Sequence, residues 1–318
     1  MFKFFLQMKT KKKYELTSET IVFNGITLHR IKALKDFSNV KAGDLGGWVE
    51  EEENLSQMGD SWIYSNAKVY GNAEIFGNAQ VYGNAQVYGD AQVYGNAKVC
   101  GDAMVYNHAM VGDNAIVFIN AEVYDNARIY NDAKVYSNAK VYGNAKVYTH
   151  AEVYGHARVF GNAEVYDKAK VYTHAEVYGH ARVFDNAIVE GNAKVTINAE
   201  IGGHARVFGN AEVYDNAKIC GDAIIYGNAE VYENAEICGD AVIRGNAKVC
   251  NKTDYIIFKN FWSSGRFFTW TRSNNMWSVG CFYGKGKELI EKAYKDSKTS
   301  GKEYERVVKY VDSILADK

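Results

Sequence analysis

Histidine is the residue type here with the most direct chemical potential, because an imidazole acts as a general base or a metal ligand near neutral pH. Six of the seven histidines are His108, His150, His156, His174, His180 and His204. His156 and His174 are the catalytic candidates, because their spacing along the chain is expected to stack them on one corner of the fold. Two imidazoles fall short of the three protein ligands of a catalytic zinc. We therefore predict no catalytic residue, no metal site and no cofactor.

Cysteine offers a second kind of chemistry. The chain has 5 cysteines without a CxxC pair, which is typical of reduced thiols in a cytoplasmic protein. Cys220 and Cys238 have the same spacing as the two candidate histidines, but we expect adjacent parallel strands to suit a disulfide poorly. The sequence contains no Ser-His-Asp arrangement, phosphate-binding loop or pair of catalytic carboxylates that can be defended.

These residues belong to a repeat of six residues. From Ile63 to Lys248 the sequence divides into 31 hexads without insertion or deletion. Position 1 is always Val or Ile, and position 5 is always Ala. Position 2 is Tyr or Phe in 23 hexads, and position 3 is most often Gly. Position 4 is mostly Asn or Asp, and it is the position that the six histidines occupy. A short, unbroken period of this kind indicates a solenoid.

The hexad predicts one short side of a polygonal coil. Side chains alternate along a strand, so Ala and Val point inward while positions 6 and 2 point outward. Gly-Asn and Gly-Asp then turn a corner, because these residues tolerate positive φ. The same tolerance in histidine explains its place at position 4 without a catalytic role. Proline is absent from the chain, as expected where it would remove a hydrogen bond between coils.

The charges at position 6 predict the number of sides. At a spacing of three hexads, 12 of 15 charged pairs have opposite signs, for example Arg182 and Glu200, whereas at a spacing of two hexads only 4 of 15 do. Parallel neighbours favour opposite charges. Coils with an even number of sides are therefore excluded, and three hexads per coil is the simplest solution. It gives about ten coils at roughly 4.8 Å per strand. The two candidate histidines and the two cysteines are each separated by one such coil.

Over residues 57–250 the pattern aliphatic-x-x-x-small-x resembles the hexapeptide repeat of left-handed β-helix proteins. Members of that family include acyltransferases and γ-type carbonic anhydrases. The resemblance implies a left-handed parallel β-helix. As an alternative function, it also implies an acyltransferase with a histidine base and an acyl-CoA donor between subunits. Enzymes of the family interrupt the helix with a loop over the substrate, and the hexads from Ile63 to Lys248 contain none.

Residues 1–56 are expected to form an N-terminal β cap. Ile21 to His29 predicts a hairpin across Asn24-Gly25, and Gly43 to Val49 follows. The first residues have too short an apolar run for a signal peptide, and either Met1 or Met8 is the native start. The segment Ala33–Val49, together with Asn54-Leu-Ser56, resembles the leader of uncharacterised hexapeptide-repeat proteins from bacterial and bacteriophage genomes.

Residues 251–318 are expected to form a C-terminal α+β module. The expected strands are 254–260, 266–272 and 276–282, and the expected helices are 287–296 and 302–316. Ser300 and Glu303 have the spacing of a capping box. The stretch Trp277–Gly284 resembles the small C-terminal domain of the same phage-associated proteins. Trp262, Trp270 and Trp277 form either the core of this module or a recognition surface, and core is the favoured interpretation.

The aromatic residues at position 2 are the main candidate surface. Eighteen Tyr and five Phe are expected to stack as ladders along the faces and to leave a long exposed aromatic surface. The candidate interaction residues, besides the three tryptophans, are Tyr142, Tyr148, Tyr154, Phe160, Tyr166, Tyr172 and Tyr178.

The sequence therefore favours a non-catalytic binding or scaffold protein, by resemblance a host-interaction protein of a phage or prophage. Its partner is a protein or a second copy of the chain, as a homodimer or homotrimer. A net charge of −1 argues against a nucleic-acid partner. The absence of an apolar run of about 20 residues argues against a membrane.

Overall fold

The computed structural model describes residues 11–262 and 264–316. The chain forms two compact units, Met1–Gly161 and Asn162–Lys318, which are described in turn. The alternative starts Met1 and Met8 lie outside the described residues.

The first unit begins with an antiparallel cap. Strands β1 (Tyr14–Phe23) and β2 (Ile26–Ala33) form the expected hairpin, and β3 (Leu45–Val49) pairs with β2. Asn24 and Gly25 have φ of 50° and 81°, which is the left-handed conformation that a two-residue hairpin turn requires. A 3-10 turn, η1 (Glu52–Asn54), follows.

Strand β3 joins the cap to the repeats. It runs parallel to β5, with Trp48 opposite Lys68, and its Trp48 N–H donates to the Ala67 carbonyl at 2.9 Å. The Lys13 ammonium is buried and donates to the Ser61 carbonyl at 2.9 Å. Burial lowers the pKa of Lys13 to about 8. The cap thus supplies partners for backbone groups of the first coil.

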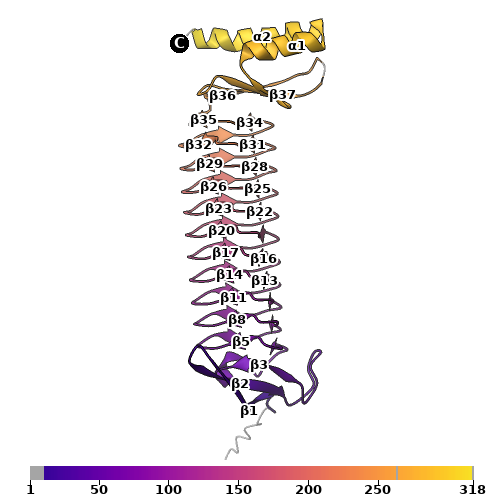
Figure 1. The fold of residues 1–318 in the computed structure, drawn as a ribbon, viewed down its shortest axis with the longest axis vertical. Helices are drawn as coiled ribbons and strands as arrows, with labels where there is room; N and C mark the ends of the chain where they lie inside the picture. Colours follow the sequence, from indigo (N-terminus) through magenta and orange to yellow (C-terminus); the bar gives the residue numbers. More distant parts are fainter. Residues whose placement is uncertain (1–10, 263, 317–318) are drawn as a thin grey trace, which may run out of the picture. The chain divides into compact units, whose positions relative to one another are not determined.

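The repeats of the first unit form three parallel faces, and strands of faces I and II are labelled in Figure 1. Face I contains β5 (Lys68–Val69), β8 (Gln86–Val87), β11 (Met104–Val105), β14 (Glu122–Val123), β17 (Lys140–Val141) and β20 (Arg158–Val159). Face II contains β4 (Trp62–Ile63), β7 (Gln80–Val81), β10 (Lys98–Val99), β13 (Ile116–Ile119), β16 (Lys134–Ser137) and β19 (Glu152–Val153). Face III contains β6 (Glu74–Ile75), β9 (Gln92–Val93), β12 (Met110–Val111), β15 (Arg128–Ile129) and β18 (Lys146–Val147).

The repeats of the second unit also form three parallel faces, which carry the same labels. Face I contains β23 (Glu176–Val177), β26 (Lys194–Val195), β29 (Glu212–Val213), β32 (Glu230–Val231) and β35 (Lys248–Val249). Face II contains β22 (Lys170–Val171), β25 (Ile188–Val189), β28 (Arg206–Val207), β31 (Ile224–Ile225) and β34 (Val242–Ile243). Face III contains β21 (Glu164–Val165), β24 (Arg182–Val183), β27 (Glu200–Ile201), β30 (Lys218–Ile219) and β33 (Glu236–Ile237).

Within each unit the pairing confirms three hexads per coil. Met104 lies opposite both Gln86 and Glu122, each of which is three hexads away along the chain. Every position-1 aliphatic and every position-5 alanine of the hexads is at most 1% exposed. The predicted parallel β-helix with an aliphatic interior is therefore confirmed.

The corners differ from the expectation in one respect. The left-handed conformation falls on position 3, as at Gly89 (φ 72°) and Asn107 (φ 58°). None of the histidines at position 4 has a positive φ. The explanation of histidine at position 4 by its tolerance of positive φ is therefore wrong, because the preceding residue makes the turn.

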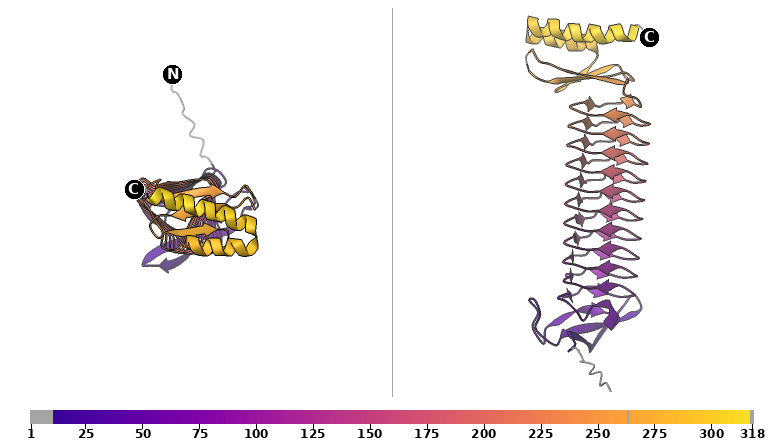
Figure 2. Two further views of the ribbon diagram at one scale, coloured as in Figure 1. Left: turned by 90° about the horizontal axis from the view of Figure 1, so that it is seen from above. Right: turned by 180° about the vertical axis from the view of Figure 1, so that it is seen from behind.

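The C-terminal module of the second unit has a four-stranded antiparallel sheet and two helices. The strands are β36 (Tyr255–Lys259), β37 (Phe267–Thr271), β38 (Met276–Val279) and β39 (Phe282–Gly284), in that order. Helices α1 (Gly286–Asp296) and α2 (Lys298–Ala316) lie side by side (Figure 2). Trp270 and Trp277 are each 1% exposed in the core between sheet and helices, and Trp262 packs against that core.

Two expectations for this module are wrong. The segment 276–282 is not one strand, because a turn with Gly280 at φ 55° separates β38 from β39. The second helix begins at Lys298, so Ser300 lies inside it and cannot cap it. The Ser297 hydroxyl instead accepts the Ser300 N–H at 3.0 Å, as an N-cap does.

The module also closes the last coil of the second unit. In the coils, a position-6 N–H donates to an alanine carbonyl of the next coil, as Gln80 does to Ala97 at 2.9 Å. At the last coil, the Val242 N–H donates to the Thr269 hydroxyl at 2.9 Å. The Lys248 N–H donates to the Ser273 hydroxyl at 2.7 Å. Side-chain oxygens of the module thus accept the hydrogen bonds that carbonyl groups of a further coil would accept.

Candidate functional site

The aromatic residues at position 2 form the predicted ladders. On face I, Tyr106, Tyr124, Tyr142 and Phe160 stack with ring centroids 4.8–4.9 Å apart and planes within 5°. On the other faces, Tyr148 stacks on Tyr130 at 4.9 Å and Tyr154 on Tyr136 at 4.8 Å. In the second unit Tyr166 stacks on Phe184 at 5.3 Å. Tyr172 and Tyr178 occupy the same position on faces II and I.

These rings are less exposed than the sequence suggested. All aromatic residues at position 2 are half-buried or buried, because each ring within a ladder covers the flat side of its neighbour. Mainly ring edges and hydroxyl groups therefore face water. Burial raises the pKa of the Tyr136 hydroxyl to about 12, and the nearby Glu152 carboxylate adds to this. The expectation of a long exposed aromatic surface is thus corrected to a rigid, half-covered one.

Charged side chains at position 6 run beside the rings. Lys140 pairs with Glu122 at 2.9 Å, and Lys194 pairs with Glu212 at 3.1 Å. The predicted pair Arg182 and Glu200 is confirmed at 3.2 Å. Arginines also lie over the ring faces, as Arg158 does 5.2 Å from the Phe160 centroid. Each face thus combines aromatic edges with ordered charges.

The six position-4 histidines all point away from the interior, and none is buried. The His108 Nδ1 lies 3.2 Å from an Asp90 carboxylate oxygen, and the His150 Nδ1 lies 3.6 Å from Asp132. Asparagines form the same link between coils, as from Asn78 to Asn96 at 3.0 Å. Polar contact with the next coil is therefore the physical reason for Asn, Asp and His at this position. His156 and His174 belong to different units, and their stacking stays a prediction.

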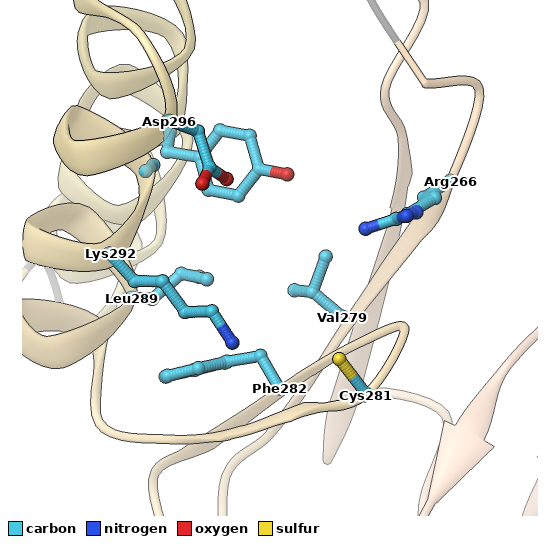
Figure 3. Close-up of a pocket in the computed structure, with 9 residues that line it drawn as sticks. Arg266, Val279, Cys281, Phe282, Leu289, Lys292 and Asp296 are labelled. Carbon is cyan, nitrogen blue, oxygen red and sulfur yellow. The ribbon is translucent and has the colours of Figure 1, made fainter.

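The C-terminal module contains a small pocket of about 70 Å³. Figure 3 shows Leu289, Lys292 and Asp296 of α1 on one side, Arg266 opposite them and the Cys281 thiol at its edge. Ligand pockets usually have about 300–1,000 Å³. The lining combines the Cys281 thiol with the Arg266 and Lys292 cations and the Asp296 carboxylate, and it contains no histidine.

Cys220 and Cys238 correct another expectation. They are joined in a disulfide between adjacent coils of face III, with Cα atoms 4.5 Å apart. That separation lies within the range that a disulfide spans, so neighbouring coils bring the two residues close enough after all. The Glu236 carboxylate lies within 4.8 Å of both sulfur atoms. Cys100, Cys250 and Cys281 are free thiols.

Two glycines at position 2, Gly112 and Gly202, interrupt the ladder of face III. The sequence already indicates these two interruptions, because in these hexads a glycine stands where most others have an outward aromatic side chain. The prediction of aromatic ladders did not single out these two hexads.

The three-sided parallel coil, with Val or Ile and Ala inside every hexad, is that of a hexapeptide-repeat-like β-helix protein. Residues 79–95 match a family model described as "YdcK Beta solenoid repeat". Over 61 residues the chain is 38% identical to the "Uncharacterized acetyltransferase YdcK" of Escherichia coli (strain K12). This segment covers 17% of the chain and 19% of that relative, so the similarity spans about a fifth of the relative's length. None of the described helices is long and apolar enough to cross a membrane.

Proposed function

We propose that the chain is a non-catalytic binding or scaffold protein whose lateral faces hold a protein partner or a second copy of itself. The observation that carries this proposal is that each unit has one closed end and that its coils follow one another without an inserted loop. The N-terminal cap and the C-terminal module satisfy the backbone groups of the outermost coils. The hexads from 63 to 248 contain no inserted loop that would cover a substrate.

The stacked rings support a binding role on energetic grounds. Binding normally costs the rotamer freedom of the side chains that become immobilised. Rings stacked at 4.8–4.9 Å have already lost most of this freedom. Their edges, together with the adjacent arginines, therefore form a preorganised surface. The resemblance to bacteriophage hexapeptide-repeat proteins supports looking for the partner among host proteins.

Substitutions on one face test this proposal. Tyr124→Ser with Tyr142→Ser changes face I, and Tyr136→Ser with Tyr154→Ser is the matched change on face II. Light scattering measures self-association, and cross-linking in the producing cells followed by mass spectrometry measures partner capture. We expect one double variant, but not the other, to weaken the complex at least tenfold while both remain folded by circular dichroism. Equal behaviour of both variants and the unmodified chain would contradict the proposal.

An acyltransferase with an acyl-CoA donor and a histidine base is the second candidate. The Escherichia coli relative is named as an acetyltransferase, which supports this candidate. Calorimetric titration with acetyl-CoA tests it, with His156→Ala and His174→Ala as the variants and His204→Ala as the matched control. Saturable binding that is lost in the first two variants and kept in the third would favour this candidate over the scaffold role.

A further inference from the structure

The ladder of face III has a missing rung at Gly112. The ring of Tyr94, one coil earlier, leans into the space, since a Cβ atom built on Gly112 would lie 2.2 Å from the Tyr94 ring. The tilt also widens the stack below, where Phe76 and Tyr94 have centroids 5.4 Å apart instead of the 4.8–4.9 Å of regular stacks. If the Tyr94 ring moved out of the space beside Gly112, it would stack on Phe76 at the regular spacing.

Beside Gly112 the surface is hollowed. A cavity of about 290 Å³ is lined by Tyr94, Met110, Arg128, Ile129, Tyr130 and Lys146. Tyr94 and Tyr130 are the position-2 rings on either side of the missing rung, and Tyr130 is itself supported by Tyr148 at 4.9 Å. The space thus lies between two aromatic side chains, the second of which is fixed.

The two charged residues that line this cavity, Arg128 and Lys146, are both positive. Arg128 lies in register between Met110 and Lys146, so neither of its neighbours along face III is acidic. Among the described residues no carboxylate forms an ion pair with Arg128. Like charges on neighbouring strands destabilise a sheet, and most charged neighbours in this chain alternate in sign. A guanidinium held beside an aromatic gap therefore offers an anion site.

The second gap, at Gly202, lacks two features that characterise the gap at Gly112, the second aromatic ring and a cation that is unpaired among the described residues. There Phe184 leans over the glycine, with a Cβ to ring distance of 2.5 Å. The position-6 residues that correspond to Met110, Arg128 and Lys146 are Glu200, Lys218 and Glu236. Glu200 forms ion pairs with Arg182 and Lys218, and Cys220 takes the place of the second ring. The chain thus contains its own control site.

We propose that the gap at Gly112 binds a planar aromatic group that carries an anionic substituent. The Tyr94 ring moves back onto the regular stack, the ligand ring takes its place between Tyr94 and Tyr130, and the anion contacts the Arg128 guanidinium with Lys146 nearby. A nucleotide and a small aromatic acid share this chemistry. The site is a small-molecule site and is distinct from the protein-binding role proposed for the faces.

Isothermal titration of the full chain tests the site with four probes. AMP carries ring and phosphate, 4-hydroxyphenylacetate carries ring and carboxylate, adenosine has no anion and inorganic phosphate has no ring. We expect AMP or the aromatic acid to bind at least tenfold more tightly than adenosine and phosphate, and the tighter of the two identifies the source. Equal or absent binding of all four probes would overturn the proposal.

Matched variants locate the binding. Gly112→Tyr restores the regular rung and Arg128→Gln removes the charge, whereas Gly202→Tyr and Lys218→Gln make the same changes at the control site. We expect the first two to weaken binding at least tenfold and the last two to change it less than twofold. If Gly112→Tyr fails to fold, Met110→Glu tests the same cavity by placing a carboxylate beside Arg128. Unchanged affinity in Arg128→Gln or in the folded cavity variant would overturn the proposal.

Discussion

The Tyr136 hydroxyl lies 3.4 Å from a carboxylate oxygen of Glu152, 16 residues further along the chain. This contact ties a ring of one coil to the position-6 residue of the next. Burial and the carboxylate together favour the neutral phenol, so the pKa of Tyr136 is raised to about 12. Burial likewise raises the pKa of Tyr124 and of Tyr214 to about 12.

Alkaline titration should reveal these shifts. The folded state holds the phenolic proton more tightly than the unfolded state, where tyrosine has a pKa of about 10. The resulting stabilisation is fully present below pH 10 and is lost as the pH rises from about 10 to about 12. We expect tyrosinate absorbance at 295 nm to rise late, together with the loss of the β-sheet circular dichroism signal. Ionisation of most tyrosines near pH 10, with the fold intact, would contradict this.

The Asn contacts between coils should contribute to stability. Asn96 accepts from the Asn78 amide and donates to Asn114, each at 3.0 Å. Asn96→Ala removes both bonds, so we expect the free energy of unfolding to fall by about 1 kcal/mol. Asn96→Asp keeps only the acceptor and should cost less than alanine. Urea unfolding followed by circular dichroism checks this, and a midpoint of Asn96→Ala equal to that of the unmodified chain would contradict it.

Ile119 should be replaceable by glycine with a gain in stability. It has φ 65° and is 46% exposed, so it has a strained backbone and little burial to lose. The left-handed conformation costs an L-residue about 1–2 kcal/mol, and the flexibility of glycine in the unfolded chain offsets part of that gain. We expect Ile119→Gly to raise the unfolding free energy by about 0.5 kcal/mol. The reverse change at the same corner, Gly101→Ile, should lower it; a lower urea midpoint for Ile119→Gly would refute the interpretation.

Mass spectrometry of the protein purified without reductant should show the cysteine pairing. We expect iodoacetamide to label Cys100, Cys250 and Cys281, and Cys220 and Cys238 to be recovered as one linked pair of peptides. Cys220→Ser provides the control, because it frees Cys238 for labelling. Labelling of all five cysteines in the native protein would show that the linkage does not form.

The coil was predictable because its determinants lie within six residues. Val or Ile at position 1 and Ala at position 5 specify the interior, and the signs at position 6 specify a register of three hexads. The two closing regions were less predictable, since their limits depend on contacts distant in sequence. Gly280 divides the expected strand in two, and Ser297 moves the start of α2 forward.

The candidate site was only partly predictable. Stacking follows from the period, but the covering of each ring by its neighbours, and hence its half-buried state, becomes visible only in three dimensions. His108 contacts Asp90 because position-4 side chains of neighbouring coils lie next to one another. The sequence of a single hexad does not reveal this contact. The gap at Gly112 was present in the sequence as an exception to a pattern. Its cationic surroundings became apparent only when Arg128 and Lys146 were placed beside it.

Release of free coenzyme A from acetyl-CoA most directly separates a scaffold from an enzyme. The released thiol is measured with a colorimetric thiol reagent, and a panel of small amines and sugars serves as acceptors. A variant that lacks all five cysteines removes the background signal of the protein's own thiols. The proposed non-catalytic role predicts a rate equal to that of the reaction without protein. This holds for the protein with all histidines unchanged and for the His156→Ala and His174→Ala variants. Sustained turnover that requires an acceptor, disappears in these two variants and survives His204→Ala would contradict it.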